Sequence, residues 1–160
     1  MGLERVSPSI RSGAAAYASY GLFLAVEAWW IAVGPRWFED ARAWAELHAF
    51  SAVGPATGAI LFLALAWAIT RGYRWAWYVA VISSGLLLVG AVGMLLTLTP
   101  GFPQLGPWPP EGTRGPALFA GVVSLVCLST GVFSLCRKEA RNWITEQQEA
   151  RHSKRSRSTT

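Results

Sequence analysis

The sequence contains little charge. Only 14% of its 160 residues are Asp, Glu, Lys or Arg, whereas roughly 25% is usual for a soluble domain. Nearly all of these charges lie outside four long apolar runs, and Glu27 is the one charged residue inside them. The segments outside the runs are short and separated from one another, which excludes a soluble catalytic domain with its own core.

Histidine and cysteine are also scarce, with two of each. His152 lies far from the apolar runs, so one chain cannot hold a haem between two histidines, and we expect no metal and no cofactor. Cys127 and Cys136 lie on one predicted helix and are separated by about 13 Å along its axis. They therefore cannot form a disulfide with each other.

The apolar runs are long enough to cross a membrane. They comprise residues 13–35, 48–70, 75–99 and 116–136, each 21 to 25 residues long. At ~1.5 Å per residue, a helix of that length covers the ~30 Å hydrocarbon core. Small residues recur in each run, which is typical of membrane helices that pack closely. The sequence predicts an all-α integral membrane protein, an antiparallel four-helix transmembrane bundle with a Pro-rich outer loop and a basic cytoplasmic tail.

The basic residues predict the orientation. Eleven of the 14 Lys and Arg residues lie in segment 1–12, in the connection Arg71–Arg74 and in the tail 137–160. Basic residues near span ends are retained in the cytoplasm, so we expect a multi-pass protein of the cell membrane with both termini cytoplasmic. Trp and Tyr residues at the ends of the runs agree, because these rings prefer the headgroup level.

The connections between the runs differ in kind. The sequence Arg71–Arg74 predicts a tight turn and therefore makes the second and third helices antiparallel neighbours. Segment Pro35–Leu47 is amphipathic and either lies on the outer surface or extends the second helix outward. Residues 100–116 contain six prolines, which predicts an extended cap over the outer end. Pro55 is expected to kink the second helix.

The tail is interpreted in two parts. Residues 137–150 continue the fourth helix onto the membrane surface, and Arg151–Thr160 is a low-complexity segment expected to be disordered. The tail either binds anionic lipid or only anchors the topology, which we favour. Its charge follows from the orientation, so no nucleic acid is expected; the partners are the lipid bilayer and a membrane protein or a second copy of the chain.

Glu27 is the main candidate functional residue. A carboxyl group in the hydrocarbon costs on the order of 2.5 to 3.5 kcal/mol, so it should face the bundle interior and have a partner on another helix. The candidate partners are His48 and Arg42, and the polar residues Ser83, Thr97, Thr99 and Ser124. The carboxyl is either proton-linked or ligand-binding, or it makes a structural interhelical hydrogen bond, and the sequence leaves both open.

Glu46 and His48 lie at the outer mouth of the second run. With Glu27 they are the candidate catalytic residues, because two carboxyls and an imidazole suffice for general acid and base chemistry within hydrogen-bond reach. The alternative, which we favour, is that both are solvated residues at a helix start. The predicted ligand-binding residues are Glu27, Trp30 and His48.

No family is recognised. In outline the chain is similar to the small multidrug resistance transporters, but its long Pro-rich loop and strong charge bias depart from their pattern. The outline is also shared with the membrane-bound enzymes of glutathione and eicosanoid metabolism, yet Arg42-Ala43 is not followed by the Asn that their second helix needs. No residue role is carried over from either family.

Three functions are consistent with the sequence. The favoured one is a non-enzymatic subunit or interaction partner of a membrane complex. The second is a transporter or carrier of a small apolar or cationic molecule, with Glu27 as the proton-linked group. The third is a membrane enzyme that acts on a lipid-like substrate through Glu27, Glu46 and His48.

Overall fold

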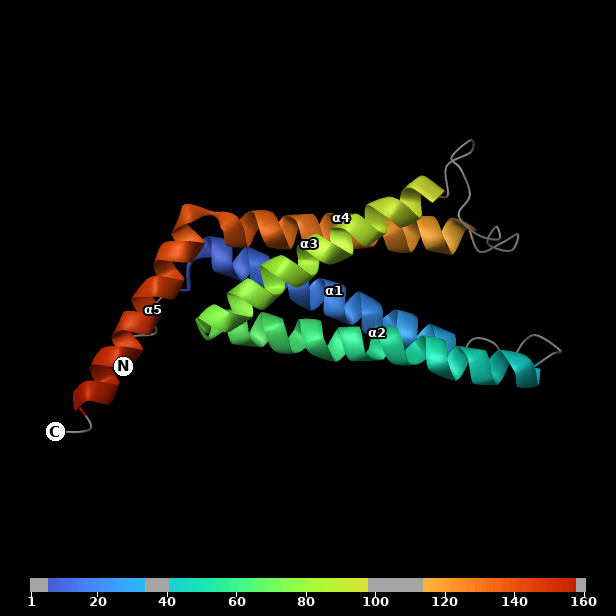
Figure 1. The fold of residues 1–160 in the computed structure, drawn as a ribbon, viewed down its shortest axis with the longest axis horizontal. Coiled ribbons are helices and arrows are strands. Elements are labelled where there is room, and N and C mark those ends of the chain that lie inside the picture. The colour runs from blue at the N-terminus through green and yellow to red at the C-terminus, as the bar shows by residue number, and fades with distance from the viewer. Residues whose placement is uncertain (1–5, 34–40, 98–113, 158–160) are drawn as a thin grey trace.

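The computed structural model describes residues 6–33, 41–97 and 114–157, without the side chains of residues 33, 41–51, 94, 97, 114–117, 152, 154, 155 and 157. The described residues form five helices (Figure 1). These are α1 (Pro8–Val33), α2 (Ala41–Thr70), α3 (Arg74–Thr97), α4 (Arg114–Cys136) and α5 (Lys138–Arg157).

Three helices are long and apolar enough to cross a membrane. Their candidate spans are Ala52–Thr70 in α2, Arg74–Gly93 in α3 and Leu118–Cys136 in α4. Helix α1 has 26 residues, but Glu27 and several Tyr, Ser and Trp residues make its described part more polar. The chain is therefore an all-helical protein with three candidate membrane spans, and a fourth span in α1 stays a prediction.

The helix ends differ from the predicted runs. Helix α1 begins at Pro8 instead of residue 13, because proline suits the first helical position and the Ser7 carbonyl accepts the Arg11 amide at 3.0 Å. Helix α2 begins at Ala41, so most of the amphipathic segment extends this helix outward. It also continues through Pro55 without ending there.

The turn between α2 and α3 is closed by backbone hydrogen bonds. The Gly72 amide donates to the Ile69 carbonyl at 2.9 Å, and the Tyr73 amide donates to the Ala68 carbonyl at 3.1 Å. Gly72 has φ 74°, a left-handed conformation that glycine adopts without strain. The predicted tight turn is therefore confirmed.

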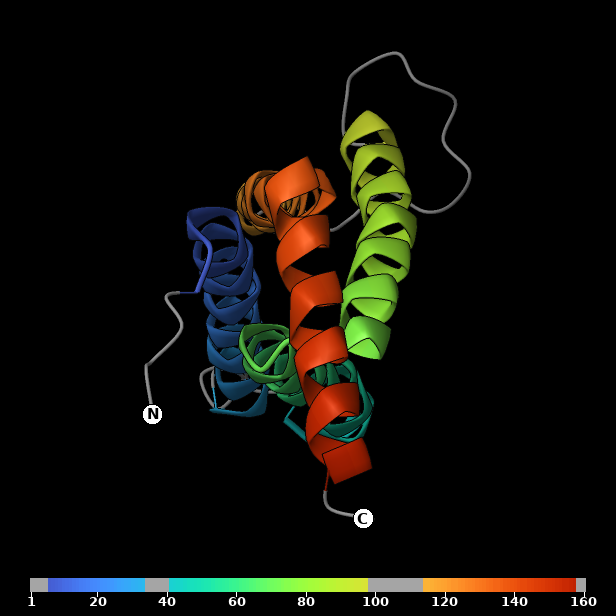
Figure 2. The same cartoon turned by 90° about the vertical axis from the view of Figure 1, so that its left-hand side faces the viewer.

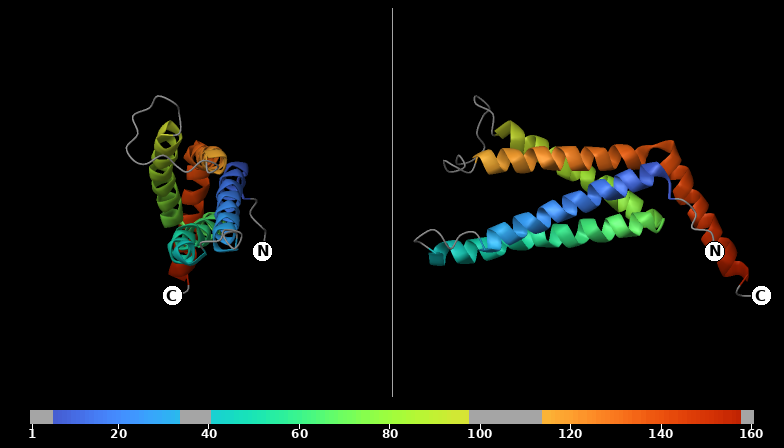
Figure 3. Two further views of the ribbon diagram at one scale, coloured as in Figure 1. Left: turned by 90° about the vertical axis from the view of Figure 1, so that its right-hand side faces the viewer. Right: turned by 180° about the vertical axis from the view of Figure 1, so that it is seen from behind.

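Helices α1 to α4 alternate in direction, and α1 lies between α2 and α4 (Figures 1 and 3). Helix α1 makes its most extensive contacts with α2, followed by α4, and α3 packs mainly on α4. Helices α2 and α3 have few contacts and diverge from their shared turn (Figure 1). Helices α2 and α3 are therefore antiparallel neighbours mainly near their shared turn, because α3 leans towards α4.

The core is centred on Tyr17 of α1, whose side chain is fully buried. Its ring stacks on Phe62 of α2 with a centroid distance of 5.8 Å. Its hydroxyl donates to the Ala80 carbonyl of α3 at 3.3 Å and accepts from Ser84 at 3.0 Å. Gly131 of α4 faces the same ring. One side chain therefore contacts the other three long helices.

We call the end where α2 and α4 end, and where α1 and α3 begin, the basic end. Helix α5 lies across it (Figure 2). The predicted continuation of α4 is a separate helix that turns away after Cys136, and it buries Ala140 and Ile144 against the rest of the protein. The expectation that Arg151–Thr160 is disordered is wrong as far as Arg157, because the Arg151 guanidinium lies 4.4 Å from the Tyr73 ring centroid and holds the helix.

Candidate functional site

A cavity of about 230 Å³ lies between α1, α3 and α4. Helix α1 contributes the Glu27 carboxyl to its wall, together with Tyr20 and two apolar side chains. The other two helices contribute mainly small residues, Gly90, Ala91, Ala120 and Gly121. Glu27 lies towards the end of α1 that is opposite the basic end, and its side chain is half-buried.

The cavity exists because α1 and α3 separate beyond Tyr17. The hydrogen bonds of Tyr17 join the two helices at Ala80 and Ser84. Among the described residues, however, no Cα atom of α1 lies within 8 Å of a Cα atom of α3. Small residues on α3 do not fill the gap, since a Cβ added at Gly90 would meet nothing within 4 Å. The space is therefore a consequence of helix geometry and of residue size.

The Glu27 carboxyl has no hydrogen bond or ion pair with the residues that the structure describes. The two other polar groups on the cavity wall are Tyr20 and Ser124, whose hydroxyl oxygens are 3.4 Å apart. Ser124 also donates to the Ala120 carbonyl of its own helix at 2.8 Å. These hydroxyls leave the carboxyl without a counter-charge inside the described part of the chain.

The predicted partners of Glu27 are placed differently from one another. Ser124 lines the same cavity, whereas Ser83 donates to the carbonyl of Ala80 in its own helix at 3.3 Å. The side chains of Arg42 and Thr97, and the whole of Thr99, lie outside the described residues. The structure therefore brings Glu27 near one of the predicted polar groups without a hydrogen bond between them.

The other predicted site residues do not contribute described groups to the cavity. Trp30 is 68% exposed and does not line the cavity. Glu46 and His48 belong to α2, but their side chains lie outside the described residues. Within the described ranges, no three His, Cys, Asp or Glu side chains gather as they would around a metal ion.

Sequence reasoning did not identify Tyr20 or Gly90 as site residues. A signal for Tyr20 is present, because it precedes Glu27 by two helical turns and so shares its face. For Gly90 there is none, since α3 has four other glycine or serine residues, Ser83, Ser84, Gly85 and Gly93. Which of them faces Glu27 depends on how α3 crosses α1.

The comparisons with known proteins identify no relative of this chain. No family model, no curated protein and no solved structure matches this chain. The function is therefore inferred from the geometry of the cavity.

Proposed function

We propose that the chain is a non-enzymatic subunit of a membrane protein complex, in which α1 to α4 all span the bilayer as one bundle with cytoplasmic termini. In this proposal a transmembrane helix of the partner protein binds at the cavity that contains Glu27. The observation that carries the proposal is the Glu27 carboxyl, which lines a cavity between three helices without a hydrogen-bonding or charged partner among the described residues.

The energetic argument starts from the cost of the carboxyl. An ionisable group in the hydrocarbon costs on the order of 2.5 to 3.5 kcal/mol, and such groups pair with one another or with polar groups of adjacent helices. A Lys, Arg, Asn or Gln side chain on a partner helix at the depth of Glu27 supplies that pairing. The proposal therefore specifies the chemistry of the partner helix.

The walls of the cavity favour a helix as the occupant. Gly90 and Ala91 of α3 and Ala120 of α4 present small side chains to the cavity, so a second backbone can approach that part of its wall closely. Helix α3 is also the least buried of the candidate spans, with 17% of its span buried inside the protein against 33% for α2 and 28% for α4. A helix bound beside Glu27 would cover part of this exposed surface.

The first prediction tests Glu27. Wild-type protein, extracted in mild detergent, should co-purify with a stoichiometric membrane protein that has a basic or amide residue in a span. Glu27→Leu removes the pairing group and should lower the recovered partner by about tenfold. Glu27→Gln keeps hydrogen-bonding capacity and should lower it less.

The control is Glu149→Gln, which removes a carboxyl from the exposed surface of α5 and should leave the partner in place. Equal melting temperatures of the variants would show that the bundle is intact. Full recovery of the partner with Glu27→Leu would contradict the proposal.

A carrier of a small cationic molecule is the second candidate, favoured by a cavity volume of about 230 Å³ next to a carboxyl. Mass spectrometry of the purified protein distinguishes the two functions. A small cation that is bound by wild type and lost with Glu27→Gln, in a sample without a stoichiometric protein partner, would replace the subunit proposal with the carrier.

A further inference from the structure

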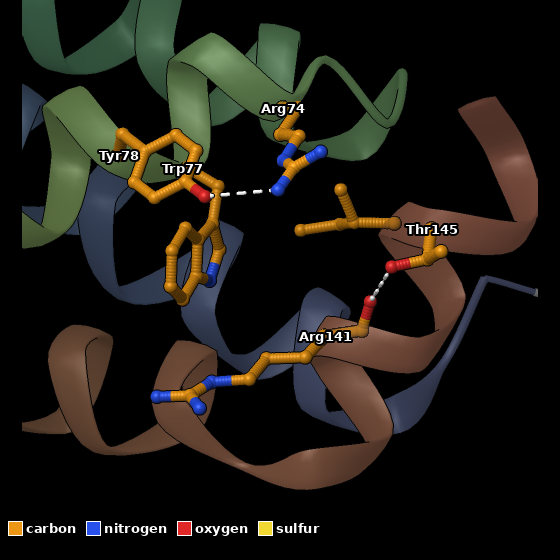
Figure 4. Close-up of a pocket in the computed structure, with 6 residues that line it drawn as sticks. Arg74, Trp77, Tyr78, Arg141 and Thr145 are labelled. Atoms are coloured by element: carbon orange, nitrogen blue, oxygen red, sulfur yellow. Dashed lines mark hydrogen bonds between the residues drawn. The ribbon is translucent and has the colours of Figure 1, made fainter.

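A second cavity, of about 320 Å³, lies at the basic end between the first turns of α3 and the helix α5. Helix α3 contributes Arg74, Trp77 and Tyr78, and α5 contributes Arg141, Ile144 and Thr145. Figure 4 shows the two arginines reaching it from different helices, on either side of the Trp77 ring. Because the Glu27 cavity lies towards the opposite end of α1, this site is independent of the proposed function.

Helix α5 is fixed in place against the α2–α3 turn. A Cβ added at Gly72 would lie 3.0 Å from the Gln147 Cβ and 3.3 Å from the Trp143 ring, so the glycine allows α5 to approach closely. Arg151 donates to the Arg71 carbonyl. Ile144, on the face of α5 that packs inward, is buried. One wall of the cavity is therefore held by packing on a backbone turn.

The opposite wall of the cavity is fixed by a hydrogen bond between α3 and α4. The Trp77 indole N–H donates to the Leu135 carbonyl at the end of α4, with an N···O distance of 2.9 Å. This bond places the Trp77 ring between the two arginines. The Arg141 guanidinium lies 5.6 Å from the centroid of that ring.

The two guanidinium groups contact uncharged aromatic and hydroxyl groups. Arg74 donates to the Tyr78 hydroxyl at 3.1 Å and lies 5.6 Å from the Tyr78 ring centroid. Neither Arg74 nor Arg141 pairs with a carboxylate of the described residues. Glu139, in the first turn of α5, accepts instead a hydrogen bond from Ser9 of α1 at 2.9 Å. The wall of the cavity therefore carries two guanidinium cations, and the described residues supply acceptors for only some of their N–H donors.

We propose that this cavity binds the phosphate group of an anionic membrane lipid. Guanidinium groups match the geometry and charge of a phosphate. The candidate span of α3 begins at Arg74, and that of α4 ends at Cys136, so the cavity lies at the level of the lipid headgroups. The aromatic rings and Ile144 offer apolar surface to the glycerol and upper acyl carbons beside that phosphate.

The second prediction tests this proposal with the full chain in detergent, and native mass spectrometry measures the bound lipid. Wild type should retain phosphatidylglycerol in preference to phosphatidylcholine with the same acyl chains. Arg74→Gln and Arg141→Gln should each lower the retained phosphatidylglycerol by about tenfold, since each removes charge-assisted hydrogen bonds. Arg141→Lys keeps the charge but loses the planar fork, so its loss should be smaller.

Arg137→Gln is the matched control. It removes the same charge at the same end, but the Arg137 guanidinium lies over Phe133 at 5.1 Å, outside the cavity. Unchanged lipid retention by this variant supports a specific site, and an equal loss would overturn the proposal in favour of general surface attraction. Retention by the Arg74→Gln, Arg141→Gln double variant would also overturn it.

A second arm separates the lipid from free phosphate. Wild type in phosphatidylcholine nanodiscs is titrated with inorganic phosphate, and binding is read from Trp fluorescence. Weak binding of free phosphate, with tighter binding of phosphatidylglycerol, supports the lipid. Inorganic phosphate that binds as tightly as the lipid would overturn the proposal, because the acyl and glycerol groups would then contribute nothing.

Discussion

Tyr17 combines packing and hydrogen bonding in one side chain. Its ring stacks on Phe62, and its hydroxyl donates to the Ala80 carbonyl while it accepts from Ser84. Interhelical hydrogen bonds of this kind in membranes contribute about 0.6 kcal/mol on average and up to about 1.7 kcal/mol. The hydroxyl is valuable here because α1 and α3 have few other contacts.

The third prediction follows from this arrangement. Tyr17→Phe keeps the stacked ring but removes both hydrogen bonds, so it should lower the free energy of unfolding by about 0.5 to 2 kcal/mol. Thermal unfolding in a fixed detergent measures the change. Tyr73→Phe, at a more exposed ring whose contact with Arg151 persists, is the control and should have little effect. Equal melting temperatures of the two variants would contradict the role of the hydroxyl.

At the scale of the helix, the small residues differ in what they face. The motif Gly54-x-x-x-Gly58 predicts close packing of α2, and a Cβ at Gly58 would indeed lie 2.9 Å from Leu24 of α1. A Cβ at Gly54 would meet nothing within 4 Å. Sequence periodicity therefore predicts which face of α2 carries small residues. It does not predict how far along α2 the neighbouring helix α1 stays in contact with that face.

The fourth prediction compares two glycines. At Gly131 an added Cβ would lie 3.0 Å from Cζ of Tyr17, and that ring cannot move without losing its hydrogen bonds. Gly131→Ala should therefore destabilise the protein by about 1 to 3 kcal/mol. Gly85→Ala, which adds a Cβ in open space, should be neutral or stabilising by up to about 1 kcal/mol. Chemical or thermal unfolding in detergent ranks them, and the reverse order would refute the packing of α4 on α1.

The end of the tail is helical, although its composition alone predicts disorder. Segment Arg151–Arg157 has no apolar residue, and such composition favours disorder in isolation. In the structure this segment continues α5, whose earlier turns bury Ala140 and Ile144. A helix that already exists is extended at little cost, so the segment is helical because of the turns that precede it and because of the contact of Arg151 with the Tyr73 ring.

For the whole molecule, the sequence predicts the helical class and the positions of the apolar runs, because length and hydropathy are local properties. It does not predict that α3 leaves α2 and crosses to α4, which depends on packing between distant residues. The same limit applies to the sites. An inward-facing Glu27 follows from the cost of burying charge, whereas the cavity of Arg74 and Arg141 requires α5 to turn back across the basic end.

The fifth prediction concerns orientation in the membrane. If α1 is a fourth span, both ends of the chain lie on the cytoplasmic side. In a chain without Cys127 and Cys136, a cysteine at Ser153 should react with an impermeant maleimide only after cells are opened. A cysteine at Gly2 should also react only after cells are opened, whereas a cysteine at Gly112 should react in intact cells; both positions lie outside the described residues. Labelling of position 2 in intact cells, with position 153 protected, would leave α1 outside the bilayer.

The contact pattern of the helices has a consequence for biosynthesis. The α1–α2 and α3–α4 contacts join helices that are adjacent in sequence, so each hairpin can pack as soon as it leaves the ribosome. The contacts of α1 with the end of α4 and with α5 are different, since Ser12–Ser134 and Ser9–Glu139 are separated by 122 and 130 residues. One face of the first helix therefore stays uncovered until almost the whole chain has been translated, and a membrane chaperone has that interval in which to shield it.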